Sequence, residues 1–330
     1  MIITRTPFRI SLFGGGTDYP AWYQEHGGAV VGTTIDKYCY LSVRELPPFF
    51  EHKHRIVYSK IENISHVDEI QHPSVKAVLG EWQSQKGVEI HHFSDLPARS
   101  GLGSSSAFTV GLLNAIRGID GKISSAEALG TEAIRIEQDV IGEKVGSQDQ
   151  IWAAHGGTNF VKFLQNGQIE VSRLIMPKKQ HTALNDHILL FFTGLTRIAE
   201  TIAVKKIENV KAKSAQLNTL KQMALHGRDI LQSRNACLEE IGLMLHDAWR
   251  LKRELADGIS NHNIDQIYDA GISAGALGGK LLGAGGGGFM MFFAPPERHE
   301  AIKAAMRQLI YVKCNIGAEG SKIVVYEPNT

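Results

Sequence analysis

The sequence has 330 residues and is poor in cysteine, in net charge and in long apolar runs. Its cysteines, Cys39, Cys237 and Cys314, lie far apart and at no metal-binding spacing, which excludes a disulfide scaffold and fits a reducing compartment. The formal net charge is +1, so no overall field attracts nucleic acid or an anionic membrane. No apolar run of about 18 residues and no secretory signal occurs. We therefore expect a cytoplasmic protein with neither nucleic acid nor a membrane as partner.

Apolar sequence is plentiful enough for two compact units. Hydrophobic residues make up 43% of the chain, and its length suggests about two domains. Strands are expected at 2–4, 9–13, 29–43, 55–59, 88–92, 159–163, 169–174, 187–192, 289–294 and 322–326. Helices are expected at 73–85, 104–117, 125–139, 146–154 and 296–309, and nearly throughout 197–276, where the charged side chains form a solvated face. This pattern predicts an α+β protein with domains 1–180 and 181–330.

The most informative stretch is a glycine- and serine-rich loop that leads into helix-compatible apolar sequence at 97–108. Glycines let the backbone approach an anion, and the start of a helix offers unpaired N–H groups and the positive end of its dipole. Taken alone, an ordinary capped helix start has the same appearance. The residues expected to bind phosphate here are Pro97, Arg99, Gly101, Leu102, Gly103, Ser104, Ser105 and Ser106.

Two further glycine clusters occur. The cluster at 283–288 has the spacing of a dinucleotide fingerprint, but a helical pattern precedes it and a strand pattern follows it, the reverse of what that motif needs. A P-loop is also excluded, because Lys280 is followed by Leu281 rather than Ser or Thr. The cluster at 9–20 is by itself compatible with a turn in which Asp18 caps a short helix.

In their order along the chain, the blocks at 9–19, 97–107 and 280–288 resemble the motifs of the galactokinase, homoserine kinase, mevalonate kinase and phosphomevalonate kinase (GHMP) superfamily. The segments 13–22, 33–38 and 146–150 are most similar to the D-glycero-D-manno-heptose 7-phosphate kinases. The resemblance implies a two-domain fold with the active site in the interdomain cleft. It also implies ATP-dependent phosphorylation of the anomeric hydroxyl of the heptose 7-phosphate, giving the 1,7-bisphosphate for nucleotide-activated heptose synthesis.

The resemblance assigns catalytic and metal-binding roles. Asp149 corresponds to the aspartate beside the acceptor hydroxyl and is the expected general base, with Arg9 next to it and to the transferring phosphate. Ser105 and Glu137 are expected to bind Mg²⁺, which prefers oxygen ligands. Ser104 or Ser106 could replace Ser105, and Asp139 could replace Glu137.

Acceptor-binding residues follow from the same resemblance. Asp18 and the amides of the preceding loop are expected to bind sugar hydroxyls, and the glycine turn near the C-terminus is expected to close over the substrate. These residues are Gly14, Gly15, Gly16, Thr17, Asp18, Gly285 and Gly286. The 7-phosphate of the acceptor needs further cations, and here the inference comes from the sequence and not from the resemblance: Arg197 is the first candidate, followed by Lys53 or Arg55, and Arg99 is a further cation.

Two other functions remain compatible with the sequence. One is a different sugar 1-kinase, of the fucokinase or galactokinase type, because Arg9, Asp18 and Asp149 would serve either acceptor. The other is a non-catalytic sugar sensor on the same fold, which the presence of Ser105, Glu137 and Asp149 together disfavours. A small-molecule sugar phosphate is the expected partner, and a homodimer is left open.

Overall fold

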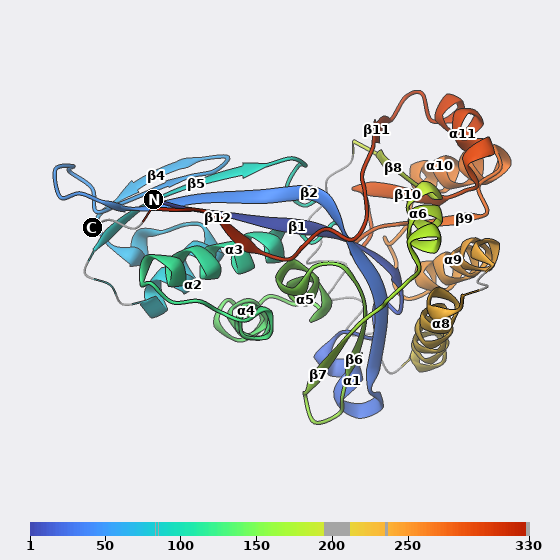
Figure 1. Cartoon of the computed structure of the whole chain (residues 1–330), viewed down its shortest axis with the longest axis horizontal. Coiled ribbons are helices and arrows are strands. Elements are labelled where there is room, and N and C mark those ends of the chain that lie inside the picture. The colour runs from blue at the N-terminus through green and yellow to red at the C-terminus, as the bar shows by residue number, and fades with distance from the viewer. Residues whose placement is uncertain (83, 85, 195–211, 235–236, 328–330) are drawn as a thin grey trace.

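Figure 1 shows the computed structural model of the chain, which describes residues 1–82, 84, 86–194, 212–234 and 237–327. In these residues a larger sheet has the strand order β12-β1-β2-β5-β3-β4, and β6 and β7 extend it from β2. All its pairs are antiparallel except β3 with β5. The strands are β1 (Ile2–Phe13), β2 (Gly28–Leu46), β3 (His54–Val57), β4 (Ile61–Ile64), β5 (Gly87–Ser94), β6 (Thr158–Phe163), β7 (Ile169–Arg173) and β12 (Lys322–Tyr326).

The second sheet is antiparallel with the order β11-β8-β10-β9. Its strands are β8 (Ile188–Phe192), β9 (Gly278–Leu281), β10 (Phe289–Phe293) and β11 (Ile310–Val312). Around it lie α6 (Lys178–Asp186), α8 (Ser214–Gln232), α9 (Leu238–Arg253), α10 (His262–Ser273) and α11 (His299–Ala305), at the end of the molecule opposite β4 and β5 (Figure 1). The predicted α+β class is confirmed.

Helices cover one face of the larger sheet (Figure 1). They are α2 (Pro73–Trp82), α3 (Ser104–Ile119), α4 (Ala126–Arg135) and α5 (Gln148–His155), and the short α1 (Pro20–His26) follows β1. Helix α3 is apolar on nearly every side and is buried along most of its length, because it packs against β1, β2 and α5. A continuous core of buried apolar side chains joins both sheets, so these elements hold the start of α3 in a fixed place.

The strands predicted at 2–4 and 9–13 form the single strand β1. Pro7 pairs with Tyr38 whereas Phe8 pairs with Ile35, so the register shifts between them. Such an irregularity accommodates a residue that has no backbone N–H to donate. As a result, Arg9 lies on a long strand that is paired with β2 from Ile2 to Phe13.

The helix predicted at 125–139 is confirmed only in its first part. The Ser125 side chain caps α4 by accepting a hydrogen bond from the Ala128 amide, and the α-helix ends at Arg135. One π-helical turn, Ile136–Val140, follows. Such turns are wider than an α-helix and are frequent at functional sites. Here the turn buries Glu137 and leaves Asp139 exposed.

Strands β9 and β12 were not fully anticipated. Strand β9 directly precedes the glycine cluster at 283–288, where a helical pattern had been expected, and β10 follows it. Because no helix opens at the cluster, the exclusion of a dinucleotide fingerprint stands. Strand β12 was predicted, but it pairs with β1 in the larger sheet, so the chain returns to its first sheet at the end. The division at residue 180 stays a prediction.

Candidate active site

A cavity of about 300 Å³ lies between the two sheets. Four separate segments form most of its lining, and Lys252 of α9 adds to it. The segments are the strand and loop at 9–19, the glycine-rich loop at 99–106, the segment 137–149 and the glycine turn at 280–287. Three blocks that are distant in the sequence therefore meet at one place, and the segment 137–149 joins them.

In the described ranges, no helix is both long and apolar enough to cross a membrane.

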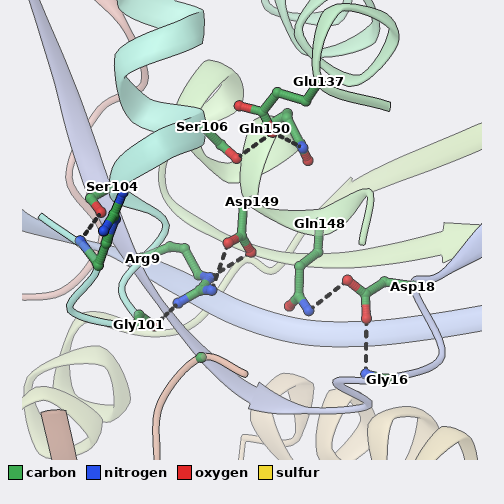
Figure 2. A network of polar contacts seen from close by, with 12 residues as sticks. Arg9, Gly16, Asp18, Gly101, Ser104, Ser106, Glu137, Gln148, Asp149 and Gln150 are labelled. Carbon is green, nitrogen blue, oxygen red and sulfur yellow. Dashed lines mark hydrogen bonds and ion pairs between the residues drawn. The ribbon is translucent and has the colours of Figure 1, made fainter. Parts of the chain in front are cut away.

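The side chains of Arg9 and Asp149 line this cavity and contact each other (Figure 2). The guanidinium donates two hydrogen bonds to the carboxylate, from Nε to Oδ1 and from Nη2 to Oδ2, both at 2.8 Å. Its Nη1 donates a third bond, at 2.7 Å, to the carbonyl of Gly101. The Arg9 side chain is 6% exposed and that of Asp149 25%, so the pair is held rigidly while the carboxylate keeps access to the cavity.

The glycine-rich loop ends at the N-terminus of α3, beside the Arg9–Asp149 pair. Gly103 is the N-cap residue and has a left-handed backbone, with φ of 78°. Ser104, Ser105 and Ser106 line the cavity in the first turn of the helix. The positive end of the α3 dipole and the free amides of its first turn therefore face the cavity, an arrangement that suits phosphate groups. Arg99 also lines the cavity, and its amide donates to the Ser104 hydroxyl at 3.1 Å.

The C-terminal glycine turn packs directly on the glycine-rich loop. A Cβ atom on Gly283 would lie 2.5 Å from Cα of Gly101, and one on Gly101 would lie 2.4 Å from the Leu282 carbonyl oxygen. Only glycine at both positions permits this approach. The Phe289 amide also donates to the Ser100 carbonyl at 3.2 Å. This contact fixes the segments on either side of the cavity against each other.

Glu137 is fully buried in the cavity wall. Its Oε2 accepts hydrogen bonds from the Ser106 hydroxyl, at 2.9 Å, and from the Gln150 side-chain amide (Figure 2). In the described part of the chain, its Oε1 is buried and has no partner. Burial raises the pKa of Glu137 to about 7, against the hydrogen bonds that lower it. Of the two carboxylates predicted as alternative metal ligands, Glu137 lines the cavity and Asp139 does not.

These groups fit a magnesium ion. An unpaired carboxylate oxygen and neighbouring serine hydroxyls are the hard oxygen ligands that Mg²⁺ prefers. Across the described residues, no three His, Cys, Asp or Glu side chains converge on one point. Mg²⁺ is commonly bound by one or two carboxylates together with substrate phosphates, so such a cluster is not required. The serine that contacts Glu137 is Ser106, whereas Ser105 is exposed and lines the cavity. The expected role of Ser105 as a metal ligand stays a prediction.

Asp18 is buried at the other end of the cavity. Its Oδ1 accepts from the Gly16 amide at 2.9 Å, and its Oδ2 accepts from the side-chain amide of Gln148 at 2.8 Å. A Cβ on Gly146 would lie 1.9 Å from Oδ2, so glycine is needed there. Burial raises the pKa of Asp18, and the charge of Asp149 adds to the rise. Asp18 does not cap α1, whose N-cap is Tyr19 and has no side-chain cap.

Two buried lysines in the cavity wall were missed at the level of sequence. Lys252 comes from α9, where charged residues had been expected to face solvent, yet it is only 7% exposed. Its ammonium group donates to the carbonyls of Leu281 and Gly283 at 2.9 and 2.7 Å. Lys280 is similarly buried and donates to the Leu12 carbonyl at 3.0 Å. The motif at 280–288 contained Lys280, but no sequence pattern singled out Lys252.

Several residues predicted for the site do not line the cavity. Leu102 is buried and its carbonyl accepts a hydrogen bond from the Arg9 amide. The Thr17 hydroxyl bonds to the carbonyls of Gly14 and Ala29, and the Gly286 amide donates to the Ile259 carbonyl. Pro97 and Gly14 are also outside the lining. By contrast, Gly15, Gly16, Gly101, Gly103 and Gly285 line it, together with the side chains described above.

The basic residues suggested for the acceptor phosphate have different outcomes. Arg197 lies outside the described residues. Lys53 directly precedes β3 and Arg55 lies on it, next to the edge strand β4 rather than at the cavity, and Arg55 is paired with Glu89 at 3.5 Å, so that suggestion is wrong. The strand order separates them from the cavity, which their position in the sequence did not reveal.

Known proteins resemble this chain over nearly its whole length. Residues 70–157 match the family model described as GHMP kinases N terminal domain, and residues 231–312 match GHMP kinases C terminal. A D-glycero-alpha-D-manno-heptose 7-phosphate kinase from Campylobacter jejuni is 30% identical over 94% of this chain and 95% of its own length.

Solved structures show the same fold. A D-glycero-D-manno-heptose 1-phosphate kinase from Bacteroides thetaiotaomicron has a TM-score of 0.78, with 23% identity over 99% of this chain and 100% of its own. A putative sugar kinase from Campylobacter jejuni has a TM-score of 0.73, with 25% identity over 98% and 97% of the two chains. These matches confirm the predicted family and fold: the chain belongs to the GHMP kinases, as a sugar kinase with N- and C-terminal domains.

Proposed function

We propose that this protein transfers the γ-phosphoryl group of ATP to the anomeric hydroxyl of D-glycero-D-manno-heptose 7-phosphate. The product is the 1,7-bisphosphate, which supplies nucleotide-activated heptose synthesis. The observation that carries the proposal is the placement of the Arg9–Asp149 pair between the N-terminus of α3 and the buried carboxylate of Asp18. A similarity to the Campylobacter jejuni heptose 7-phosphate kinase supports this choice of acceptor.

Asp149 is the base in this proposal. Its carboxylate accepts the proton of the acceptor hydroxyl as the oxygen bonds to the γ-phosphorus and the bond from that phosphorus to the ADP oxygen breaks. Arg9 holds the carboxylate in one orientation through its two bonds and places a positive charge where negative charge develops. No phosphorylated enzyme intermediate is needed.

The donor phosphates are assigned to the start of α3. The backbone of 101–106 and the Arg99 side chain would bind them, with the dipole of α3 directed at their charge. Glu137, with Ser105 or Ser106, would hold the magnesium ion. When bound, Mg²⁺ neutralises charge on the triphosphate.

The acceptor is assigned to the other end of the cavity. Asp18 would bind sugar hydroxyls, because its carboxylate oxygens have lone pairs beyond those already used by Gly16 and Gln148. Gly15, Gly16 and Gly285 would form the wall of this part of the site, supported from behind by Gly14, Thr17 and Gly286, and Arg197 would bind the 7-phosphate.

We also assign the reaction to the cytoplasm, with a sugar phosphate as the small-molecule partner and a homodimer left open. The three cysteines are free thiols, as is usual where the environment is reducing.

A panel of acceptors tests the proposal. ADP release is measured with ATP, Mg²⁺ and one of four sugars: the heptose 7-phosphate, unphosphorylated heptose, fucose or galactose. The proposal expects the highest kcat/KM with the heptose 7-phosphate. Faster turnover of fucose or galactose would make the protein another sugar 1-kinase, and absence of turnover with every sugar would favour a sensor.

A further inference from the structure

Apart from Glu137 Oε1, two buried polar atoms in the cavity wall have no hydrogen-bond partner among the described residues. They are the hydroxyl oxygen of Ser11, on β1, and the side-chain carbonyl oxygen Oε1 of Gln148, at the start of α5. Ser11 is 6% exposed and Gln148 is 8% exposed, and neither atom has a hydrogen-bond partner among the residues that the structure describes. Both residues line the cavity.

Gln148 contacts Asp18, and Ser11 lies on the other side of Gly15. The Gln148 amide nitrogen donates to the Asp18 carboxylate, which leaves the Oε1 end of the same group without a partner (Figure 2). Gly15 lies between Ser11 and Gln148: a Cβ atom on Gly15 would be 3.6 Å from the Ser11 hydroxyl oxygen and 3.9 Å from the Gln148 amide nitrogen. Because Gly15 has no side chain, no side-chain atom of this residue fills the space between the two groups.

The chemistry of the two atoms is complementary. Gln148 Oε1 can only accept a hydrogen bond, whereas the Ser11 hydroxyl can donate one. Buried polar groups are rarely left unpaired, because each unpaired group costs free energy in the folded protein. A ligand hydroxyl that donates to one residue and accepts from the other satisfies both at once.

We propose that Ser11 and Gln148 bind one hydroxyl of the acceptor sugar, next to a hydroxyl bound by Asp18. The three side chains then recognise a pair of neighbouring hydroxyls and select the acceptor by the presence and orientation of both. This assignment rests on the proposed function and adds two substrate-binding residues to it. A deoxy sugar leaves both buried groups unpaired and is bound more weakly.

Binding measurements test the assignment separately from turnover. Titration calorimetry with an unreactive ATP analogue present gives the Kd of the heptose 7-phosphate and of its 2-, 3- and 4-deoxy derivatives. For the wild type, two derivatives should bind about 10- to 100-fold more weakly than the parent sugar: one lacks the hydroxyl bound by Asp18, and the other lacks the hydroxyl bound by Ser11 and Gln148. In Ser11→Ala the parent sugar should lose about 10-fold in affinity, while one of these two derivatives, the one that lacks the hydroxyl bound by Ser11, loses little.

Two further variants complete the design. Gly15→Ala places a methyl group in contact with the Ser11 hydroxyl and the Gln148 side-chain amide, and should weaken binding of every sugar, with the Kd of the ATP analogue unchanged. Ser321→Ala removes a hydroxyl that bonds to Thr6 and Asn114 outside the cavity, and should leave sugar binding unchanged. Ser11→Ala should also leave the protein at least as stable in urea, since it removes an unpaired buried group.

The results separate the assignment from the proposed function. Equal loss of affinity for the parent sugar and all derivatives in Ser11→Ala, or unchanged affinity for each, would overturn the assignment even if the wild type turns over heptose 7-phosphate. If Ser11→Ala no longer distinguishes the parent sugar from one deoxy derivative, the assignment is supported. This conclusion concerns binding, so it stands even if ADP release shows that another sugar is the better substrate.

Discussion

Replacing Arg9 with lysine tests the geometry of the cavity centre most sharply. The guanidinium makes three hydrogen bonds, two to Asp149 and one to the Gly101 carbonyl, and its side chain is almost fully buried. An ammonium group keeps the charge but cannot form the two parallel bonds to a carboxylate. If two charge-assisted bonds are lost at about 1.5 kcal/mol each, the deficit is about 3 kcal/mol, or about 100-fold in rate if it falls on the transition state.

Steady-state kinetics and urea unfolding measure the effect of Arg9→Lys. We expect kcat to fall about 100-fold with little change in the KM for ATP, because the lost bonds orient the base rather than the donor. Arg5→Lys is the matched control, since Arg5 lies on the same strand with its guanidinium over the Tyr38 ring, outside the cavity. A kcat for Arg9→Lys equal to that of Arg5→Lys would refute the assigned role of the pair.

Three other changes have defined outcomes. Ser106→Ala should raise the Mg²⁺ concentration needed for half-maximal activity about 10-fold, and a larger effect of Ser105→Ala would make Ser105 the ligand instead. With a chelator present, the free energy of unfolding is compared between the wild type and Glu137→Gln. Burial raises the pKa of Glu137 in the folded state from its usual 4.5 to about 7, so the wild-type value minus the variant value should be largest below pH 4.5 and fall by about 3 kcal/mol as the pH rises through 7. A difference independent of pH would contradict this. Gly146→Ala should raise the acceptor KM at least about 10-fold and destabilise the fold by about 1–3 kcal/mol, since its methyl group would displace Asp18; an unchanged KM would show that Asp18 does not bind the acceptor.

Local patterns were sufficient to predict the elements that carry the chemistry. The glycine-rich loop leads into α3 as expected, since an apolar run after clustered glycines and serines has few other structures available. Asp149 was expected within a helix and lies in the first turn of α5. The contact between Asp149 and the loop at 101–106 was predicted from the family resemblance, because no local pattern links residues so far apart.

The features that were missed depend on tertiary structure. The π-helical turn that buries Glu137 has no recognised sequence pattern, and Lys252 on α9 is indistinguishable in sequence from its solvated neighbours. The unsatisfied hydroxyl of Ser11 is visible only once its surroundings are known, because a serine in a strand is ordinarily unremarkable. Similarly, the position of Arg55 away from the cavity follows from the strand order, which involves pairings distant in sequence.

The most direct test of the central claim is a product analysis with wild-type protein and Asp149→Asn. Each is incubated with ATP, Mg²⁺ and D-glycero-D-manno-heptose 7-phosphate, and phosphorus NMR follows the signal of a second phosphate on the sugar. The account predicts a phosphate at the anomeric position with the wild type, and a rate at least about 100-fold lower with Asp149→Asn, while ATP binding is unchanged. Equal rates for the two proteins, or a phosphate at another position of the sugar, would contradict it.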